Sequence, residues 1–321
     1  MKNTLALVRQ SNLPVTPNLV QRAGEKTARR FLEFFAANIR NINTRQAYAQ
    51  ACRGFLESMD GLGIELHSIE PLHVAAYVEQ LTQQRAPSTV KQHVAAIRQM
   101  FDYLVTGQSV PFNPAASVKP PKHVSDGGKT PILQADELRA LFASFDPDSL
   151  IDARDRAILS VMTYSFARVS ATAKLRVRDY YRQGAQAWFL LREKGGRENK
   201  VPVHHQAASY IEHYLQLAGI ADQRETPLFR SVKGRTGALT GKPMLRGNIF
   251  DMIRRRAQAA GLPVEIGCHS FRGSGITNYL TNGGTLETAA KIAGHRSTTT
   301  TQLYDRRHEQ VNQAEIERIR F

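Results

Sequence analysis

Four short segments in the C-terminal half of the 321-residue chain carry side chains that could act together on a phosphodiester. They hold two arginines, a lysine, two histidines and a tyrosine: Arg168, Lys194, His269, Arg272, His295 and Tyr304. A guanidinium forms paired hydrogen bonds with phosphate oxygens and stays charged at any working pH. The sequence offers no carboxylate or Cys/His cluster suited to catalytic metals, so protein cations would have to stabilise the charge of a pentavalent transition state. We therefore expect phosphoryl transfer without a cofactor.

The spacing of these residues supports a joint role. His269 lies three residues before Arg272, so one face of a helix can present both to one phosphate. Tyr304 is suited to be the nucleophile, because nearby cations would ease deprotonation of a phenol whose ordinary pKa is near 10. Taken singly, each residue has an ordinary explanation, such as a solvated charge, a turn lysine, a core histidine or a packing tyrosine. The hypothesis depends on their combination.

Local sequence indicates which elements hold these side chains. LETAAKIAGH predicts a helix over residues 286–293 that ends at Gly294 in the left-handed conformation and leaves His295 in a loop. Ser297 or Thr298 could begin a short helix that bears Tyr304, which would make the nucleophile movable. VRDYYRQG, QAWFLLRE and NKVPV are rich in aromatic and β-branched residues and predict a three-stranded antiparallel sheet.

The chain changes character at a proline-rich stretch, residues 111–132, which we expect to be a linker. Its five prolines and a Gly-Gly pair preclude a long helix. Apolar spacing over residues 24–110 predicts an all-helical bundle, whereas residues 1–23 show little periodicity and are expected to form a loose arm. Residues 133–321 combine helices, including one that starts near Asp152, with the small sheet and a C-terminal tail. The predicted fold is mainly α-helical with a small antiparallel β-sheet, in two domains.

The net charge favours a polyanionic partner. The chain has 43 Lys and Arg against 28 Asp and Glu, a formal charge of +15, and a pI near 10.1. Residues 119–321 hold most of this excess, with 31 basic and 20 acidic side chains. Solubility alone could explain it, but nucleic acid is the better partner. A membrane-surface protein would carry a cationic amphipathic helix with an aromatic face, whereas the single tryptophan, Trp188, lies in a strand-like segment.

The remaining composition predicts a cytoplasmic protein with no membrane partner. No apolar run approaches the length needed to cross a bilayer. The apolar stretch among the first residues is too short for a secretory signal. The only cysteines, Cys52 and Cys268, lie far apart in sequence and indicate neither a disulfide framework nor a zinc site.

Taken in order, the motifs resemble those of the tyrosine recombinase family, which includes phage integrases and Xer-type recombinases. The family has an Arg in R-(I/V)-S, a Lys in a β-hairpin, H-x-x-R, a G-H dipeptide and a Tyr nine residues after that His. The chain matches each of them: Arg168 in R-V-S, Lys194 in E-K-G-G, His269 and Arg272 in H-S-F-R, His295 in G-H, and Tyr304.

The chain departs from the family at two points. Ala171 stands where the family usually has an acidic residue, directly after R-(I/V)-S, and that acid is regarded as support for the first arginine. Tyr164 and Ser165 stand where a turn that ends in glycine is common.

The resemblance implies a fold and a reaction. The fold is an N-terminal SAM-like core-binding domain and a C-terminal catalytic domain of the DNA breaking-rejoining type. In the reaction, Tyr304 attacks duplex DNA and forms a 3′-phosphotyrosyl linkage with a free 5′-hydroxyl, without metal or ATP. Lys194 would be the general acid for the leaving oxygen, His269 an acid or base that serves Tyr304, and His295 a donor to a non-bridging oxygen. Four protomers would hold two DNA sites, with an accessory protein or partner recombinase as an optional addition.

Other residues are expected to contact the DNA backbone, because basic side chains and helix starts suit phosphates. They are Thr44, Arg45, Ser88, Thr89, Lys91, Lys119, Lys122, Arg254, Arg255, Arg256 and Arg296.

Two alternatives stay open at the level of sequence. One is a DNA-binding or architectural protein that kept the fold and lost catalysis, for which Ala171 is the only support. The other is a type IB topoisomerase, which would use the same chemistry without choosing a site.

Overall fold

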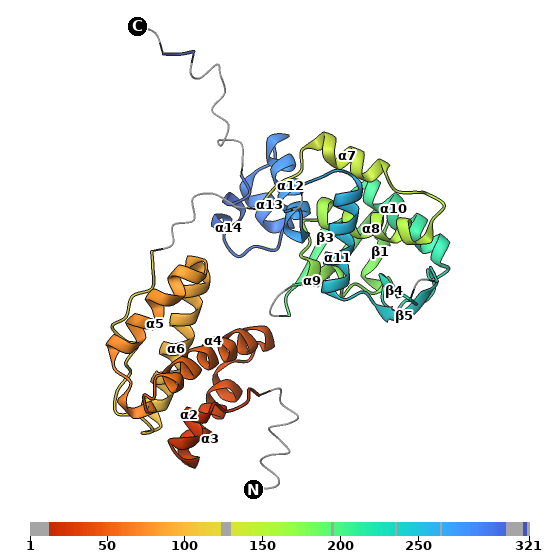
Figure 1. Cartoon of the computed structure of the whole chain (residues 1–321). Helices are drawn as coiled ribbons and strands as arrows, with labels where there is room; N and C mark the ends of the chain where they lie inside the picture. The colour runs from red at the N-terminus through yellow and green to blue at the C-terminus, as the bar shows by residue number, and fades with distance from the viewer. Residues whose placement is uncertain are drawn as a thin grey trace. The chain divides into compact units, whose positions relative to one another are not determined.

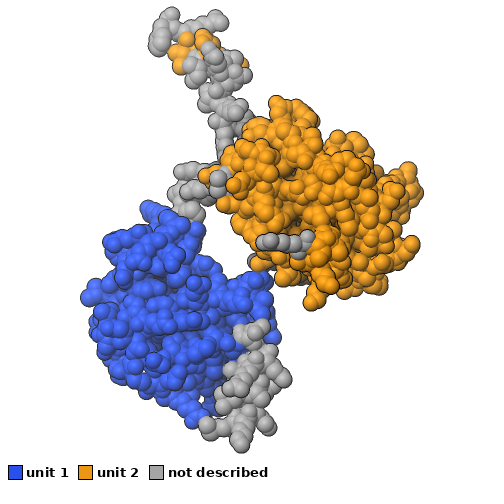
Figure 2. Space-filling view, turned by 45° about the vertical axis from the view of Figure 1, so that its right-hand side comes forward, with its two compact units in different colours: residues 1–125 blue, residues 126–321 orange. Residues whose placement is uncertain are grey.

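The computed structural model describes residues 13–122, 130–193, 196–234, 236–263, 265–305 and 317–319. The chain divides into two compact units, residues 1–125 and 126–321 (Figure 2). Each unit has its own hydrophobic core. The units are mainly helical, with small antiparallel sheets in the second, which confirms the predicted fold class (Figure 1). Within the described ranges, no helix has both the length and the apolar character needed to cross a membrane.

Unit 1 is a bundle of helices. Its elements are α2 (Asn18–Arg22), α3 (Glu25–Glu33), the π-helix η1 (Phe34–Asn38), α4 (Ile42–Gly61), the 3-10 helix η2 (Leu66–Ser68), α5 (Pro71–Gln84) and α6 (Pro87–Thr106). The side chain of Asn41 starts α4 by accepting hydrogen bonds from the backbone N–H groups of Asn43 and Thr44, at 3.0 and 3.2 Å. Proline occupies the first turn of α5 and of α6, where its missing N–H and fixed φ suit a helix start.

The predicted loose arm is partly wrong. Residues 18–22 form α2, and its Leu19 and Val20 are fully buried in the core of unit 1. A five-residue helix is too short for its periodicity to be visible in a sequence. Residues 1–12 of the predicted arm lie outside the described residues.

The chain has fixed hydrogen-bond partners near the start of the predicted linker, residues 111–132, and directly after its end. The guanidinium of Arg98 on α6 donates to the carbonyl of Ala115, at 3.1 Å, and Ala115 is fully buried in the core of unit 1. At the other end, the N–H of Leu133 donates to the hydroxyl of Ser274 in unit 2, at 2.6 Å. Both ends of the proline-rich stretch thus have fixed partners.

Unit 2 combines helices with two small antiparallel sheets. Its helices are α7 (Ala135–Ala143), α8 (Leu150–Tyr164), α9 (Val169–Thr172), the 3-10 helix η3 (Val177–Asp179), α10 (His205–Ala218), α11 (Arg246–Ala259), α12 (Cys268–Thr281), α13 (Leu286–Ile292) and α14 (Thr298–Gln302). Its strands are β1 (Tyr180–Gln183), β2 (Gln186–Arg192), β3 (Glu198–Pro202), β4 (Arg230–Val232) and β5 (Leu239–Pro243).

The first sheet has the order β1-β2-β3, as the sequence predicts. Along β2, alternate residues are buried, with Ala187, Phe189 and Leu191 facing the core. The second sheet, in which β4 and β5 pair antiparallel across an irregular register, was not predicted. These strands are short and separated by a polar, glycine-containing turn, so they lack a clear alternating pattern.

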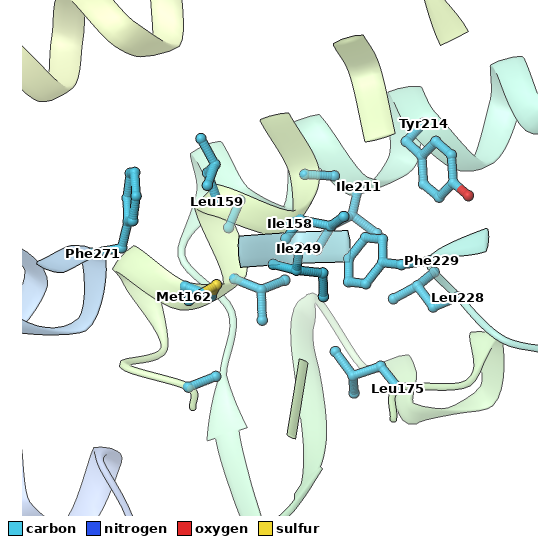
Figure 3. Close-up of a cluster of buried hydrophobic side chains, with 14 of the residues drawn as sticks. Ile158, Leu159, Met162, Leu175, Ile211, Tyr214, Leu228, Phe229, Ile249 and Phe271 are labelled. Atoms are coloured by element: carbon cyan, nitrogen blue, oxygen red, sulfur yellow. The ribbon is translucent and has the colours of Figure 1, made fainter. Parts of the chain in front are cut away.

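Helix α8 lies at the centre of the unit 2 core. Ile158, Leu159 and Met162 are fully buried, and Figure 3 shows them in one cluster with Ile211 of α10 and Phe229. The helix starts a turn earlier than expected, with Ser149 as its N-cap, because the Ser149 hydroxyl accepts from the N–H of Asp152 at 3.3 Å. Asp152 is therefore not the cap, and its carboxylate is free to bind Arg256.

An ion network ties α8 to α11. The fully buried Asp155 accepts hydrogen bonds from Arg154, at 2.7 Å, and from Arg256, at 2.9 Å. Asp152 binds the same Arg256 guanidinium at 2.5 Å. Arg256 is therefore engaged within unit 2, and its contact with DNA, like that of Arg254 and Arg255, stays a prediction.

Candidate active site

Unit 2 brings five of the six predicted catalytic residues together, and Lys194 lies outside the described residues. Arg168 is the N-cap of α9, and His269 and Arg272 both lie on α12, as their spacing predicts. His295 follows α13, and Tyr304 follows α14. In Figure 1 the helices α12, α13 and α14, coloured blue, lie together at one side of unit 2.

Arg272 is held rigidly below the surface of the site. Its side chain is 1% exposed, and its guanidinium donates to the carbonyl of Phe166 and, at 2.8 Å, to that of Ala293. The same guanidinium donates to Nε2 of His295. Burial and then the charge of Arg168 lower the pKa of Arg272 to about 10, so it keeps its charge at neutral pH.

The backbone at Phe166 is shaped to reach Arg272. Phe166 has φ 52°, a left-handed conformation that costs a residue with a Cβ about 1 to 3 kcal/mol. A Cβ on Gly275 of α12 would lie 2.0 Å from the carbonyl oxygen of Thr163 and 3.0 Å from the Phe166 ring, so only glycine lets α12 approach this turn. This left-handed residue directly follows Tyr164 and Ser165, which stand where the family commonly has a turn that ends in glycine.

His295 is neutral, and its tautomer follows from its neighbours. A guanidinium can only donate, so Nε2 of His295 must accept from Arg272 and carry no proton. Nδ1 then donates to the hydroxyl of the buried Thr301, at 2.8 Å. Burial, followed by the charges of Arg272 and Arg168, lowers the pKa of His295 to about 4. The donor role predicted for His295 requires a proton on Nε2, which either the other neutral tautomer or a second proton would supply.

The loop that carries His295 is fixed by the first sheet. Gly294 has φ 61°, the left-handed conformation predicted from sequence. A Cβ at Gly294 would lie 3.3 Å from Cγ of Glu193 and 3.4 Å from Nδ2 of Asn199. Asn199 of β3 donates to the carbonyl of Ile292, the last residue of α13, at 2.9 Å. Glu193, directly after β2, and Asn199 of β3 thereby pack against the loop that carries His295.

Tyr304 packs against α12 with its backbone held at both ends. Its N–H donates to the carbonyl of Thr301, at 2.9 Å, and its carbonyl accepts from the hydroxyl of Thr277, at 2.7 Å. Its ring is nearly parallel to that of His295, with 6.3 Å between the centroids, and a Cβ on Gly273 would lie 3.2 Å from it. Ser297 caps α14 as predicted, but the helix ends at Gln302, so the tyrosine follows the helix and is not part of it.

Arg168 is the more open of the two arginines. Its side chain is 30% exposed, and its guanidinium donates to Glu193, a carboxylate that is 4% exposed at the end of β2. Its charge reaches the other site residues, since it lowers the pKa of Arg272 and of both histidines. For His269, burial is the largest cause of the lowered pKa, followed by the charge of Arg272 and then that of Arg168. His269 is therefore neutral at pH 7 and can accept a proton.

Residues 131–310 match the model of the phage integrase family, which covers more than half of the chain. The chain belongs to this family of tyrosine recombinases. The tyrosine recombinase XerD of Shewanella oneidensis is 27% identical over 272 residues, 82% of this chain and 85% of that protein. XerC of Salmonella typhi is 28% identical over 218 residues, 68% of this chain and 69% of that protein.

Solved recombinase structures share the fold over nearly the whole chain. The XerH recombinase in a pre-cleavage complex with its difH substrate has a TM-score of 0.66 and 17% identity, with coverage of 95% of this chain and 96% of that one. The lambda integrase tetramer bound to a Holliday junction has a TM-score of 0.67 and 15% identity, with coverage of 96% and 83%. At these identities the likeness is one of fold.

The tyrosine recombinase motifs account for the cations and the nucleophile, but not for the residues that position them. Glu193, Asn199, Thr277 and Thr301 each hold a motif residue or its loop. One sequence signal existed for the first of these, because the acid missing at Ala171 implies that another group must pair with Arg168. Within the described ranges, no three His, Cys, Asp or Glu side chains gather as a metal site would require.

The predicted DNA contacts fall into two groups. Ser88, Lys91, Lys119, Lys122, Arg254, Arg255 and Arg296 are exposed, and Thr89 is half-buried. Thr44 and Arg45 are engaged within unit 1: the Thr44 N–H donates to Asn41, and the Arg45 guanidinium donates to the carbonyl of Ile39 at 2.9 Å. Contact between any of these residues and DNA stays a prediction.

Proposed function

We propose that the chain is a site-specific recombinase that cuts duplex DNA through a 3′-phosphotyrosyl intermediate at Tyr304 and rejoins it to a partner strand. One observation carries the proposal: the Arg272 guanidinium and the His295 ring lie against the side chain of Tyr304, and the charges of Arg168 and Arg272 both act on the neutral imidazole of His269. Such a set can bind a phosphodiester, stabilise added negative charge and take up the phenolic proton.

In the proposed reaction, the oxygen of Tyr304 attacks phosphorus while the bond to the 5′-oxygen breaks. The phenolic proton passes to His269, whose lowered pKa leaves it unprotonated and able to act as the base. Arg168 and Arg272 bind the non-bridging oxygens, and His295 joins them once its Nε2 carries a proton. Lys194 supplies the proton that the leaving 5′-oxygen requires, as the family resemblance implies. Rejoining is the reverse reaction with a different 5′-hydroxyl, so no ATP is needed.

We propose that four protomers act on two DNA sites. Support comes from the lambda integrase solved as a tetramer on a Holliday junction and from XerH solved on its difH substrate. In this assembly unit 1 and the exposed basic residues hold the duplex. The biological outcome would be integration, excision or resolution of a mobile element or replicon, with or without a partner recombinase.

The test is covalent trapping. Duplex fragments of the source genome, each with a nick that lets the cut end diffuse away, are incubated with the chain, and protein–DNA adducts are isolated under denaturing conditions and sequenced. We expect adducts enriched in one sequence, formed in excess EDTA, and absent for Tyr304→Phe. Tyr181→Phe, on β1, is the matched control and should behave as wild type.

Each alternative gives a different result in this assay. A binding protein that lost catalysis would retain DNA but form no adduct. A type IB topoisomerase would form adducts without sequence enrichment and would relax supercoiled plasmid. A requirement for magnesium would refute the cofactor-free part of the proposal.

A further inference from the structure

Glu193 is a buried acid whose role the family motifs do not explain. It directly follows β2 and directly precedes Lys194. Its side chain is 4% exposed, and one carboxylate oxygen, Oε2, accepts from Nη1 of Arg168. The other oxygen, Oε1, is buried and has no hydrogen-bond partner within the described residues. A buried carboxylate costs several kcal/mol unless it is well paired, so an acid at this place calls for an explanation.

The hairpin and the His295 loop hold Glu193 in this position. Its N–H donates to the carbonyl of Arg197, at 2.7 Å, which closes the turn between β2 and β3. Its Cγ lies so near Gly294 that a Cβ there would be 3.3 Å away. The carboxylate therefore sits between Arg168 and the loop that carries His295, and its backbone and side chain are both confined.

The charge balance of the site explains what the carboxylate does. Arg168 and Arg272 repel each other, and Arg168 lowers the pKa of Arg272 while Glu193 raises it. Before DNA arrives no phosphate offsets this repulsion, and the flexible Arg168 side chain would turn toward solvent. Pairing with Glu193 holds one edge of its guanidinium toward the protein and leaves its other N–H groups for a ligand.

Helix α9 offers no acid to do this. Ala171 is 1% exposed and occupies the position where the family usually has the acid that supports the first arginine. Instead, the Arg168 guanidinium donates to the carboxylate of Glu193, which directly follows β2.

We propose that Glu193 is a positioning residue that orients Arg168 toward the scissile phosphate, in place of the acid missing from α9. The inference rests on the proposed function, because it assumes that Arg168 binds that phosphate. It also makes the orientation of Arg168 depend on the residue that directly precedes Lys194 in the sequence.

The test uses single-turnover adduct formation on the nicked duplex recovered by trapping. Glu193→Gln keeps the shape and one acceptor oxygen but loses the charge, whereas Glu193→Ala loses both. We expect the rate to fall in the order wild type, Glu193→Gln, Glu193→Ala, with a total loss of up to about 100-fold, since misplacing a binding group by about 1 Å can cost that much. Affinity for the intact duplex should stay within about twofold. Glu198→Gln, an exposed acid of the same hairpin, is the matched control.

Rescue separates orientation from general support of the fold. Ala171→Glu restores the family's acid, and in the Glu193→Ala background it should recover at least about tenfold of the lost rate, a gain that a merely structural role for Glu193 would not allow. A wild-type or faster rate for Glu193→Ala would overturn the proposal, and a faster rate would show that the carboxylate blocks the phosphate site.

A second readout does not depend on DNA cleavage. NMR of arginine side chains in the free protein should show slowly exchanging N–H protons for Arg168 that are lost in Glu193→Ala and kept in Glu198→Gln. If wild type forms no adduct with any DNA, the proposed function fails while this measurement still tests the pairing. If wild type cleaves and the Arg168 signals are the same in Glu193→Ala, only the positioning role fails.

Discussion

The two arginines of the site are held in opposite ways. Arg272 is 1% exposed and is bound by two backbone carbonyls and a histidine, all of which are present before any ligand arrives. Arg168 is 30% exposed and depends on one carboxylate from another element. One side of the site is therefore built into the fold, and the other is adjustable. The difference suggests that the Arg168 side is where changes in the protein can tune activity without unfolding it.

Arg272→Ala should produce the largest effect, because it removes a ligand for phosphate and leaves the carbonyls of Phe166 and Ala293 unpaired. Loss of one such donor lowers the rate by about 10² to 10³-fold, and each unpaired carbonyl costs about 1 to 3 kcal/mol. Both the adduct rate and the thermal midpoint should drop. Arg139→Ala, an exposed arginine of α7 that is not among the predicted DNA contacts, is the control and should change neither midpoint nor cleavage rate more than slightly.

Arg168→Ala should reduce the rate by about 10²-fold with a different effect on stability. The variant leaves Glu193 buried without its partner, which destabilises the fold by about 1 to 3 kcal/mol. Removing that carboxylate as well, in Arg168→Ala/Glu193→Ala, should restore most of the thermal midpoint and none of the cleavage. A thermal midpoint that stays low in the double variant would mean that the two arginines are held in the same way.

Gly294→Ala tests the contact between the His295 loop and Glu193, the residue that pairs with Arg168. The left-handed backbone costs alanine about 1 kcal/mol, and the new Cβ would also crowd Glu193 and Asn199. Gly184→Ala is the matched control, because Gly184 has φ 59° and nothing within 4 Å of the new Cβ. Thermal unfolding should show a greater loss for Gly294→Ala than for Gly184→Ala, and only the former should slow cleavage. Equal losses would show that the crowding has no effect.

The titration of His295 should show the smallest effect. In the free protein its ring should titrate with a pKa of about 4, because burial and the two arginines oppose protonation. Since the unfolded chain takes up this proton at higher pH, the contribution of His295 to stability falls as pH drops from about 6.5 toward 4. Arg168→Ala should raise the pKa of His295 only modestly, because Arg168 ranks behind burial and Arg272 among the causes. Side-chain NMR provides the measurement.

The sequence predicted those parts of the site that depend on neighbours along the chain. The pair His269 and Arg272 lies on one helix, and Gly294 is left-handed, because helical spacing and the need for glycine at a helix end are local properties. The three-stranded sheet was equally visible in the aromatic and β-branched residues of its strands.

What the sequence could not reveal depends on contacts between distant segments. Glu193 meets Arg168 across 25 positions, and Arg256 meets Asp152 across 104, so nothing in the local sequence of either acid identifies the arginine with which it pairs. Helix α2 and the strands β4 and β5 were missed because they are too short to show a period. In each case tertiary packing, and not propensity, decides the structure.

The hydroxyl of Thr277 on α12 binds the backbone carbonyl of Tyr304, and the tyrosine ring lies beside Gly273 on the same helix. Tyr304 is thus docked on the helix of the same polypeptide that carries Arg272, so in the proposed reaction each subunit would use its own tyrosine. In mixtures of active and Tyr304→Phe subunits, cutting should consequently decline in direct proportion to the inactive fraction, because a crippled subunit cannot be complemented by the nucleophile of another.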